Sequence, residues 1–278
     1  MGSDRIPTAM TLATTDSGGG AGTAADLKAF AACGVHGTMA VVALTAQSTT
    51  GVSRIETIPA EMIVEQVRMI VEDIGVDAVK VGMLADAPTV EAAAEALSLV
   101  EEAPVVIDPV MVAESGALLL DAAGRRALIE RALPLAAVAT PNLAEARELT
   151  GLAEEASQEE LARAVQALGP DAVVVTGGHT EEGADLFFDG DEAVAIPGAR
   201  HPDGASHGSG CTHSSALAAN LALGYAPLEA ARRARELASA AVAAGLREIG
   251  AGAGPVDALD IRSRMQRPSV AARGSGAA

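Results

Sequence analysis

The sequence predicts an α/β protein: a three-layer α/β/α fold with a mostly parallel central sheet and a late β-hairpin. Short apolar segments alternate with segments of helical spacing over most of the 278 residues, which is typical of a parallel sheet covered by helices on both faces. Residues 105–107 are all β-branched and apolar, as expected for a strand buried on both faces. Asp189-Gly190 separates two short β-rich segments and predicts the hairpin turn.

The expected elements follow one another without a linker or an internal repeat, which favours one domain over residues 1–264. The expected strands cover residues 8–14, 37–45, 77–83, 104–108, 136–140, 171–176, 184–188 and 192–196. The expected helices cover residues 24–33, 59–74, 89–99, 121–133, 144–150, 158–168, 214–223 and 228–245. Residues 265–278 are rich in Ser, Arg, Gly and Ala, and we expect them to form a disordered tail.

The composition restricts the partners that this chain can have. The formal net charge is −18, which argues against nucleic acid, because binding it relies on basic side chains that neutralise phosphates. The chain has no apolar run of about 18 residues and no signal-like start, so we expect neither a membrane span nor a signal peptide. Two cysteines, Cys33 and Cys211, do not make a disulfide framework, which favours a cytoplasmic protein.

The segment HGSGCT at residues 207–212 precedes an Ala-rich segment of helical character. Small residues before a helix leave backbone N–H groups free to bind an anion. Gly208, Ser209 and Gly210 are therefore candidates for an anion hole around a transferred phosphoryl group. Cys211 is a candidate base, because the positive end of a helix favours a thiolate. The alternative is a capped surface helix with a small buried cysteine.

Chemically distinctive residues follow most of the expected strands. Parallel sheets bind ligands beyond the carboxyl ends of their strands, so we expect these residues to surround one site. They are Asp16, Gln47, Met83, Asp108, Asn142 and Thr176. The glycine-rich loop at residues 16–22 has neither the G-x-G-x-x-G nor the G-K-[ST] spacing. Its glycines more simply let the backbone approach a small ligand.

Nine segments occur in a specific order from near the start of the chain to about residue 260. They are DSGGGAG (16–22), ADLK (25–28), ALTAQ (43–47), VGML (81–84), DPVM (108–111), TPNLAEA (140–146), GGH (177–179), HGSGCT (207–212) and GAGPV (252–256). Each alone is weak evidence, whereas the ordered set is specific. The chain thereby resembles the hydroxymethylpyrimidine and phosphomethylpyrimidine kinases of thiamine biosynthesis, within the ribokinase-like superfamily.

The resemblance implies ATP-dependent phosphorylation of the hydroxymethyl group of an aminopyrimidine, and then of the resulting monophosphate. It implies ATP and Mg²⁺ as cofactors and a homodimer, and it leaves open whether a monovalent cation assists. The implied substrate-binding residues are Gln47, Asp26, Gly19, Ala21, Met83 and Val110. The implied ATP-binding residues are Asp108, Asn142, Glu145, Thr176 and Gly178, with Mg²⁺ held through water by Glu145 and Asp108. The Gln47 amide offers a donor and an acceptor, which suits an aminopyrimidine.

Structural roles compete with several of these assignments. Asn142 and Glu145 have the spacing of a helix capping box, and Asp26 has the position of a first-turn helix acid. Met83 and Val110 also suit plain core packing. One departure from the family pattern concerns Thr176, because many members carry a lysine there; a threonine offers phosphate only a hydroxyl hydrogen bond.

Two further departures are Thr14, where the family often has glycine, and Ser209, which replaces a threonine. A pyridoxal or pyridoxine kinase of the same fold is the nearest rival function, because its substrate also carries a hydroxymethyl group on a six-membered ring. A non-catalytic pyrimidine-binding regulator is the rival from another class. The presence of Cys211, Glu145 and the glycine loop argues against the regulator.

Overall fold

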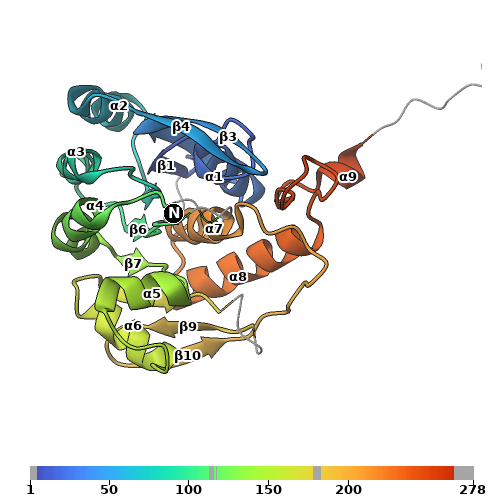
Figure 1. Ribbon diagram of the computed structural model, residues 1–278. Helices are drawn as coiled ribbons and strands as arrows, with labels where there is room; N and C mark the ends of the chain where they lie inside the picture. The colour runs from blue at the N-terminus through green and yellow to red at the C-terminus, as the bar shows by residue number, and fades with distance from the viewer. Residues whose placement is uncertain (1–4, 113–115, 117, 178–182, 266–278) are drawn as a thin grey trace, which may run out of the picture.

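A computed structural model describes residues 5–112, 116, 118–177 and 183–265, and its centre is an eight-stranded sheet (Figure 1). The strand order is β10-β9-β8-β7-β6-β5-β1-β2. The bounds are β1 (Thr8–Ala13), β2 (His36–Val41), β5 (Ala78–Val81), β6 (Val105–Ile107), β7 (Val138–Ala139), β8 (Ala172–Val175), β9 (Asp185–Phe188) and β10 (Ala193–Ile196). The first six run parallel, whereas β9 and β10 form an antiparallel hairpin. The predicted mixed sheet with a late hairpin is confirmed.

Helices cover both faces of this sheet (Figure 1). One layer consists of α2 (Ala60–Asp73), α3 (Ala87–Leu97), α4 (Ala122–Ala127), α5 (Leu143–Thr150) and α6 (Gln158–Gln166). The other consists of α1 (Gly22–Ala32), α7 (Ser209–Ala222) and α8 (Pro227–Ala243). The three predicted layers are therefore present.

Two hydrophobic clusters, one on each face, explain why the strands are apolar without alternation. Met10 and Leu12 of β1 belong to the cluster under α2 and α3, whereas Ala9 belongs to the cluster under α1 and α7. Successive side chains of a strand point to opposite faces, so a strand covered on both sides needs apolar residues at every position. The second cluster is rich in alanine, and such small side chains let α7 and α8 pack closely against each other and the sheet.

The ribbon beside the sheet differs from the prediction. The expected strand 37–45 is two strands, β2 and β3 (Ala43–Ser48), and β3 pairs with β4 (Gly51–Thr57) in a separate antiparallel sheet. Val42 is fully buried at the break between β2 and β3. No strand was expected at 51–57, because β4 is largely solvent-exposed and lacks the apolar alternation that reveals a half-buried strand.

Two helical segments also differ from expectation. The expected helix 121–133 is α4 followed by a π-helical turn (Leu128–Ala132) and a 3-10 turn (Leu133–Leu135); Pro134 lacks the N–H that a regular helix needs. The helix expected from residue 214 begins at Ser209, so the HGSGCT motif forms its first turn. A short helix, α9 (Ile261–Arg264), was not expected.

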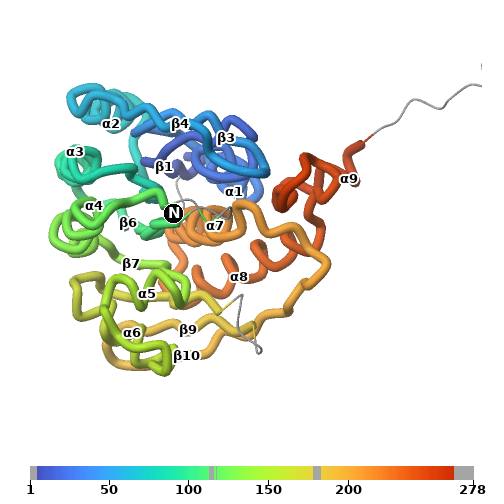
Figure 2. Tube along the Cα trace, viewed as in Figure 1, coloured from blue at the N-terminus to red at the C-terminus, as the bar shows by residue number. Residues whose placement is uncertain are grey.

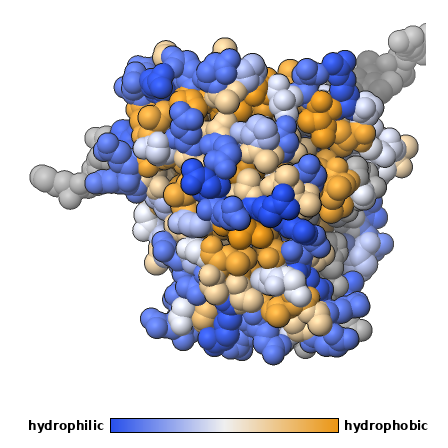
Figure 3. All heavy atoms as spheres, turned by 60° about the vertical axis from the view of Figure 1, so that its left-hand side comes forward, coloured by the Kyte–Doolittle hydropathy of each residue, from blue (hydrophilic) through white to orange (hydrophobic). Residues whose placement is uncertain are grey.

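The chain beyond α8 returns to the tip of the β3–β4 ribbon, as the trace in Figure 2 shows. There the Gly252 amide donates to Thr49 Oγ1 at 3.2 Å. Figure 3 shows orange apolar patches separated by blue polar residues on the face turned forward from the left of Figure 1. Among the described residues, none of the helices combines the length and the apolar character that a membrane span requires.

Candidate active site

Five parallel strands end at one edge of the sheet, and this edge gathers the predicted site residues. The Thr14 amide, after β1, donates to the Met83 carbonyl after β5 at 3.2 Å. The Asp108 amide donates to Val81 at 2.9 Å, and Asn142 bridges to Thr176 in parallel register. The loops after β1, β5, β6, β7 and β8 are therefore neighbours, as expected for ligand-binding loops of a parallel sheet.

The first turn of α7 lies against the glycine loop. Gly208 is the N-cap residue of α7 and has φ +83°; a Cβ there would lie 1.8 Å from the Gly20 carbonyl oxygen. Only glycine satisfies both the backbone angle and the contact. The Ser209 amide donates to Ser206, whereas the amides of Gly208, Gly210 and Cys211 have no hydrogen-bond partner among the described residues. Two of the three amides of the predicted anion hole, those of Gly208 and Gly210, are thus unengaged there, and the Cys211 amide is a further candidate donor.

Cys211 does not have the low pKa expected at a helix N-terminus. Burial raises the pKa of its thiol to about 12, and the negative charges of Asp26 and Asp108 add to this effect. The Lys80 ammonium and the Gly22 amide oppose it without reversing it. The structure therefore favours a neutral thiol over the expected thiolate at neutral pH, because desolvation and nearby carboxylates outweigh the helix dipole.

Asp26 lies below the site. Both Asp26 and Lys80 are fully buried, and Lys80 Nζ lies 2.9 Å from Asp26 Oδ1. Ser215 donates to the same carboxylate at 2.7 Å and Thr11 donates at 2.6 Å. Direct contact between Asp26 and a substrate does not fit this arrangement, because the side chain has no exposed surface. The contact was implied by the family resemblance, and nothing local indicated a lysine 54 residues later.

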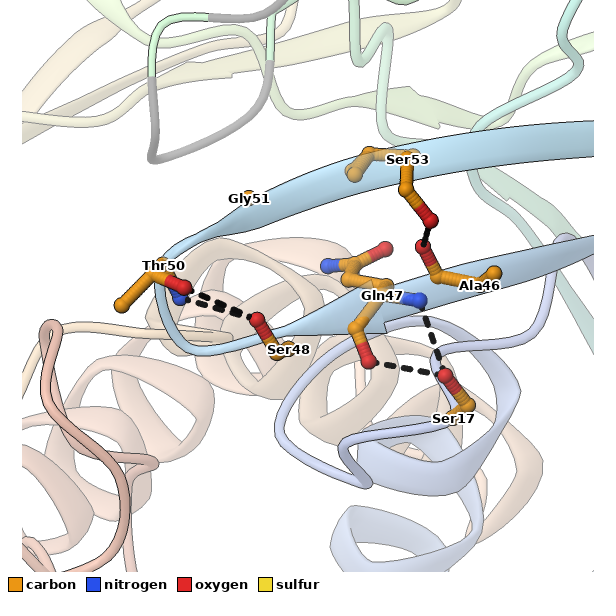
Figure 4. Close-up of a pocket in the computed structure, with 8 residues that line it drawn as sticks. Ser17, Ala46, Gln47, Ser48, Thr50, Gly51 and Ser53 are labelled. Carbon is orange, nitrogen blue, oxygen red and sulfur yellow. Dashed lines mark hydrogen bonds between the residues drawn. The ribbon is translucent and has the colours of Figure 1, made fainter.

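Gln47, the predicted substrate contact, lies on β3 beside the glycine loop. It lines a pocket of about 460 Å³ with residues of the β3–β4 ribbon, and Ser17 of the glycine loop closes one side (Figure 4). Ser17 Oγ accepts from the Gln47 amide N–H at 2.8 Å and donates to its carbonyl at 2.7 Å. The side-chain oxygen of Gln47 accepts from Thr45 at 3.3 Å. Its N–H groups donate to no partner among the described residues, which leaves them available to a ligand.

The remaining predicted substrate residues surround this region. Met83 is almost fully buried at the end of β5, and Val110 is half-buried after β6. Gly19 has φ +74° and its carbonyl accepts from Lys28 at 2.6 Å. The Ala21 amide donates to Asp16 at 2.8 Å, so that amide is already engaged. The part of the loop that a ligand can use is its backbone surface around Gly19.

Asn142 and Glu145 form a capping box at the start of α5. The Glu145 amide donates to Asn142 Oδ1 and the Asn142 amide donates to Glu145 Oε2, each at 2.9 Å. The structural alternative is thus confirmed for these two residues. It does not exclude a second role, because a carboxylate oxygen has more than one lone pair.

Asp108 and Glu145 are two buried carboxyl groups that raise each other's cost of ionisation. Burial, with the negative charge of Asp108, raises the pKa of Glu145 to about 8 despite hydrogen bonds from the amides of Asn142 and Met111. Burial raises the pKa of Asp108 as well, although Lys80 and Ser214 oppose it. Such a pair fits Mg²⁺, which prefers oxygen ligands and commonly binds one or two carboxylates, waters and substrate phosphates. Among the described residues, no cluster of three or more His, Cys, Asp or Glu could hold a metal by itself.

Thr176 follows β8, and its amide donates to Pro141 at 2.9 Å. Gly178, the last predicted ATP-binding residue, lies outside the described residues. A buried cluster around Asp185 lies next to Thr176. The Gly177 amide donates to Asp185 Oδ1 at 2.9 Å. His213 Nε2 lies 3.4 Å from Asp185 Oδ2, and Arg235 Nη1 lies 3.6 Å from Asp185 Oδ1. This cluster brings two basic side chains to the end of the strand whose threonine supplies only a hydroxyl. The sequence showed no spacing that would have revealed it.

Comparisons with known proteins agree with this geometry. The sequence pattern of the phosphomethylpyrimidine kinase family matches residues 16–257. A hydroxymethylpyrimidine/phosphomethylpyrimidine kinase of Rhizobium meliloti is 47% identical over 254 residues, which are 89% of this chain and 95% of the relative. One from Streptomyces coelicolor is 43% identical, over 90% of this chain and 94% of the relative.

Solved structures agree as well. A phosphomethylpyrimidine kinase from Clostridium difficile has a TM-score of 0.73 at 35% identity, covering 84% of this chain and 97% of that one. An ADP complex of Bacillus subtilis pyridoxal kinase has a TM-score of 0.85 at 35% identity, covering 93% and 99%. This chain has the ribokinase-like fold of these kinases, is a phosphotransferase, and belongs to the phosphomethylpyrimidine kinase family.

Proposed function

We propose that this enzyme uses ATP to phosphorylate 4-amino-5-hydroxymethyl-2-methylpyrimidine, and then the resulting monophosphate, to the diphosphate. The observation that carries the proposal is the meeting of two complementary surfaces at one edge of the sheet. The Gln47 side of the pocket offers amide N–H groups to a polar ring, and the first turn of α7 offers the unpaired amides of Gly210 and Cys211 to a phosphate. The names of the relatives support the choice of a pyrimidine.

Binding positions the acceptor. Gln47 donates to the pyrimidine, the backbone around Gly19 carries the ring edge, and Met83 and Val110 bound its apolar face. The hydroxymethyl oxygen then lies toward α7. Transfer of a phosphoryl group involves a loose transition state, so the enzyme contributes mainly alignment and stabilisation of charge. The amides of Gly210 and Cys211 stabilise the charge on the transferred group.

The acceptor hydroxyl must lose its proton as its oxygen forms the bond to phosphorus and the bond to the leaving ADP oxygen breaks. A thiol with a pKa of about 12 must lose its own proton to solvent before it can act as a base. We assign Cys211 this role: its thiolate accepts the hydroxyl proton late, as the oxygen–phosphorus bond forms and makes the hydroxyl acidic, and Cys211 is a thiol again after transfer. Lys80 supports the thiolate that acts as the base, because its positive charge lowers the pKa of Cys211.

We propose that the nucleotide phosphates extend beyond α7 to the ends of β6, β7 and β8, where the chain carries Asp108, Asn142, Glu145 and Thr176. We propose that Asp108 and Glu145 hold Mg²⁺ through water and that Thr176 donates its hydroxyl to a phosphate. The metal ion supplies charge neutralisation of the phosphates. Arg235 lies 3.6 Å from Asp185, whose carboxylate accepts from the Gly177 amide that follows Thr176, and its guanidinium supports binding of the same anion in place of a lysine. Whether a monovalent cation adds to this site is decided by activity assays in potassium, sodium and tetramethylammonium salts.

One assay separates the proposed substrate from its rival. ATP consumption is measured with the hydroxymethylpyrimidine, its monophosphate and pyridoxal side by side. Pyridoxal kinase is the alternative, and two of the similar solved structures are pyridoxal kinases. We expect turnover with both pyrimidines, and an increase of about tenfold or more in their KM in Gln47→Ala, since a lost hydrogen bond in a buried site costs roughly 1–3 kcal/mol. Turnover of pyridoxal alone contradicts the proposed substrate, and turnover of none contradicts the kinase assignment.

We also propose a cytoplasmic homodimer. The support for the compartment is the pair of free thiols, Cys33 and Cys211, which a reducing environment preserves. The support for the dimer is a group of exposed apolar side chains around the edge strand β2: Met39, Leu44, Met62 and Met69. Light scattering of the wild type and of Met39→Glu tests it, and a monomeric wild type contradicts it.

A further inference from the structure

The His207 side chain joins two segments that are far apart in the sequence. Its Nε2 lies 2.9 Å from Asp16 Oδ2, although 191 residues separate them, and both side chains are buried. A carboxylate can only accept, so Nε2 carries the proton of this hydrogen bond. Burial opposes ionisation of Asp16, but hydrogen bonds from His207 and from the amides of Gly18 and Ala21 outweigh it and hold its pKa below the usual value. Asp16 is therefore a carboxylate at neutral pH.

Asp16 organises the glycine loop from inside. Its Oδ1 accepts from the Gly18 amide at 2.7 Å, and its Oδ2 accepts from the amides of Gly20 and Ala21 at 3.0 and 2.8 Å. With His207, four donors converge on one carboxylate. The Asp16 side chain is only 1% exposed, so Asp16 acts on the shape of the loop and does not act on the ligand.

The backbone of His207 is held from the opposite side. Its amide donates to Gly254 at 3.3 Å, and its carbonyl accepts from Val256 at 3.1 Å. The contact between the two loops is tight: a Cβ on Gly20 would lie 2.2 Å from the His207 ring, and one on Gly208 would lie 1.8 Å from the Gly20 carbonyl. The ring thus has a fixed position between the glycine loop and the residue that opens α7.

We propose that His207 and Asp16 form a positioning pair, which sets the distance between the acceptor-binding loop and the phosphate-binding amides of Gly210 and Cys211. The inference rests on the proposed function, in which the acceptor binds on the first segment and the phosphoryl group binds on the second. Neither side chain of the pair touches the reacting atoms. A displacement of about 1 Å between two reactants can lower the rate roughly 100-fold. The affinity for each reactant changes little, because each one still binds to its own segment.

The test compares two substitutions of His207. His207→Phe keeps an aromatic ring and removes the donor, whereas His207→Gln can place an amide N–H near the position of Nε2. We expect His207→Phe to lower kcat about 10- to 100-fold, with the KM of ATP and of the hydroxymethylpyrimidine within about threefold of wild type. His207→Gln should restore at least a third of kcat. Asp77→Asn is the matched control, because Asp77 also accepts a loop amide, that of Thr8 at 2.7 Å, at the opposite end of the sheet; its kcat should equal that of wild type.

Hydrogen exchange of residues 16–22 and 207–211 adds a readout that does not depend on activity. In His207→Phe both segments should lose protection together, while α2 keeps its own. Three results overturn the positioning pair and leave the kinase assignment intact. The first is an unchanged kcat in His207→Phe, and the second is an effect of His207→Phe on KM alone. The third is a loss of kcat that is equally large in His207→Gln and Asp77→Asn. If the wild type phosphorylates none of the three acceptors, the proposed function is overturned. In that case hydrogen exchange still tests the pair: if only one of the segments 16–22 and 207–211 loses protection in His207→Phe, the positioning pair is overturned as well.

Discussion

Replacing Lys80 with methionine tests the charge balance beneath the site. The change keeps most of the side-chain length but leaves Asp26 as a fully buried carboxylate whose remaining donors are Ser215 and Thr11. Removing one partner of a buried ion pair costs about 3–5 kcal/mol. A chain of this size loses roughly 2–4 °C of melting temperature per kcal/mol, so we expect Lys80→Met to melt about 6–20 °C below wild type in calorimetry or thermal circular dichroism.

Two control variants show whether the unpaired charge of Asp26 causes the loss of stability. In Asp26→Asn/Lys80→Met no charge remains, and the amide oxygen of the asparagine still accepts from Ser215 or Thr11. The double variant should therefore recover most of the lost stability. Lys28→Met removes the only other lysine of the chain, which donates to the Gly19 carbonyl from a partly exposed position, and it should cost less than half as much. A loss below about 1 kcal/mol in Lys80→Met, or an equal loss in the double variant, would refute the argument that an uncompensated carboxylate is the cause.

Three further predictions concern the site. The pKa of about 8 for Glu145 lies above its value in the unfolded chain, so the folded state binds an extra proton and the free energy of unfolding should fall as pH rises from about 5 to 8. In Glu145→Gln this dependence on pH, measured by urea titrations, should be weaker. An unchanged dependence would contradict the raised pKa. Gly208→Ala should cost more than about 2 kcal/mol, because left-handed strain of roughly 1–2 kcal/mol adds to a clash with the Gly20 carbonyl. Gly224→Ala has a similar φ of +87° and open space around the added carbon, so it should show the strain alone; equal losses in urea would mean that the clash is absent. Cys211→Ala should lower kcat about 10- to 100-fold with little change in KM, as expected for loss of a proton acceptor. A kcat equal to that of wild type in steady-state assays would show that the sulfur takes no part in the reaction.

Much of the fold was predictable because it depends on local patterns. Continuous apolar segments such as 105–107 indicate strands buried on both faces, and the spacing between them indicates helices that cover a parallel sheet. The topology then brings the ends of β1, β5, β6, β7 and β8 to one edge, so the gathering of Asp108, Asn142 and Thr176 around it was also predictable. The β3–β4 ribbon was not, because β4 is exposed and has no apolar face for a pattern to reveal.

The chemistry of individual side chains was decided by the tertiary structure. Asp26 was expected to face the substrate, yet a lysine from β5 buries it in an ion pair. Cys211 was expected to be a thiolate at a helix end, yet burial and two carboxylates make it a thiol. The HGSGCT motif forms the first turn of α7, but its histidine had no role until the fold placed it on Asp16. Sequence patterns carry the period of an element and the type of its residues, whereas pKa values and pairings depend on distance and desolvation, which arise only when segments such as 16–22 and 207–211 pack together.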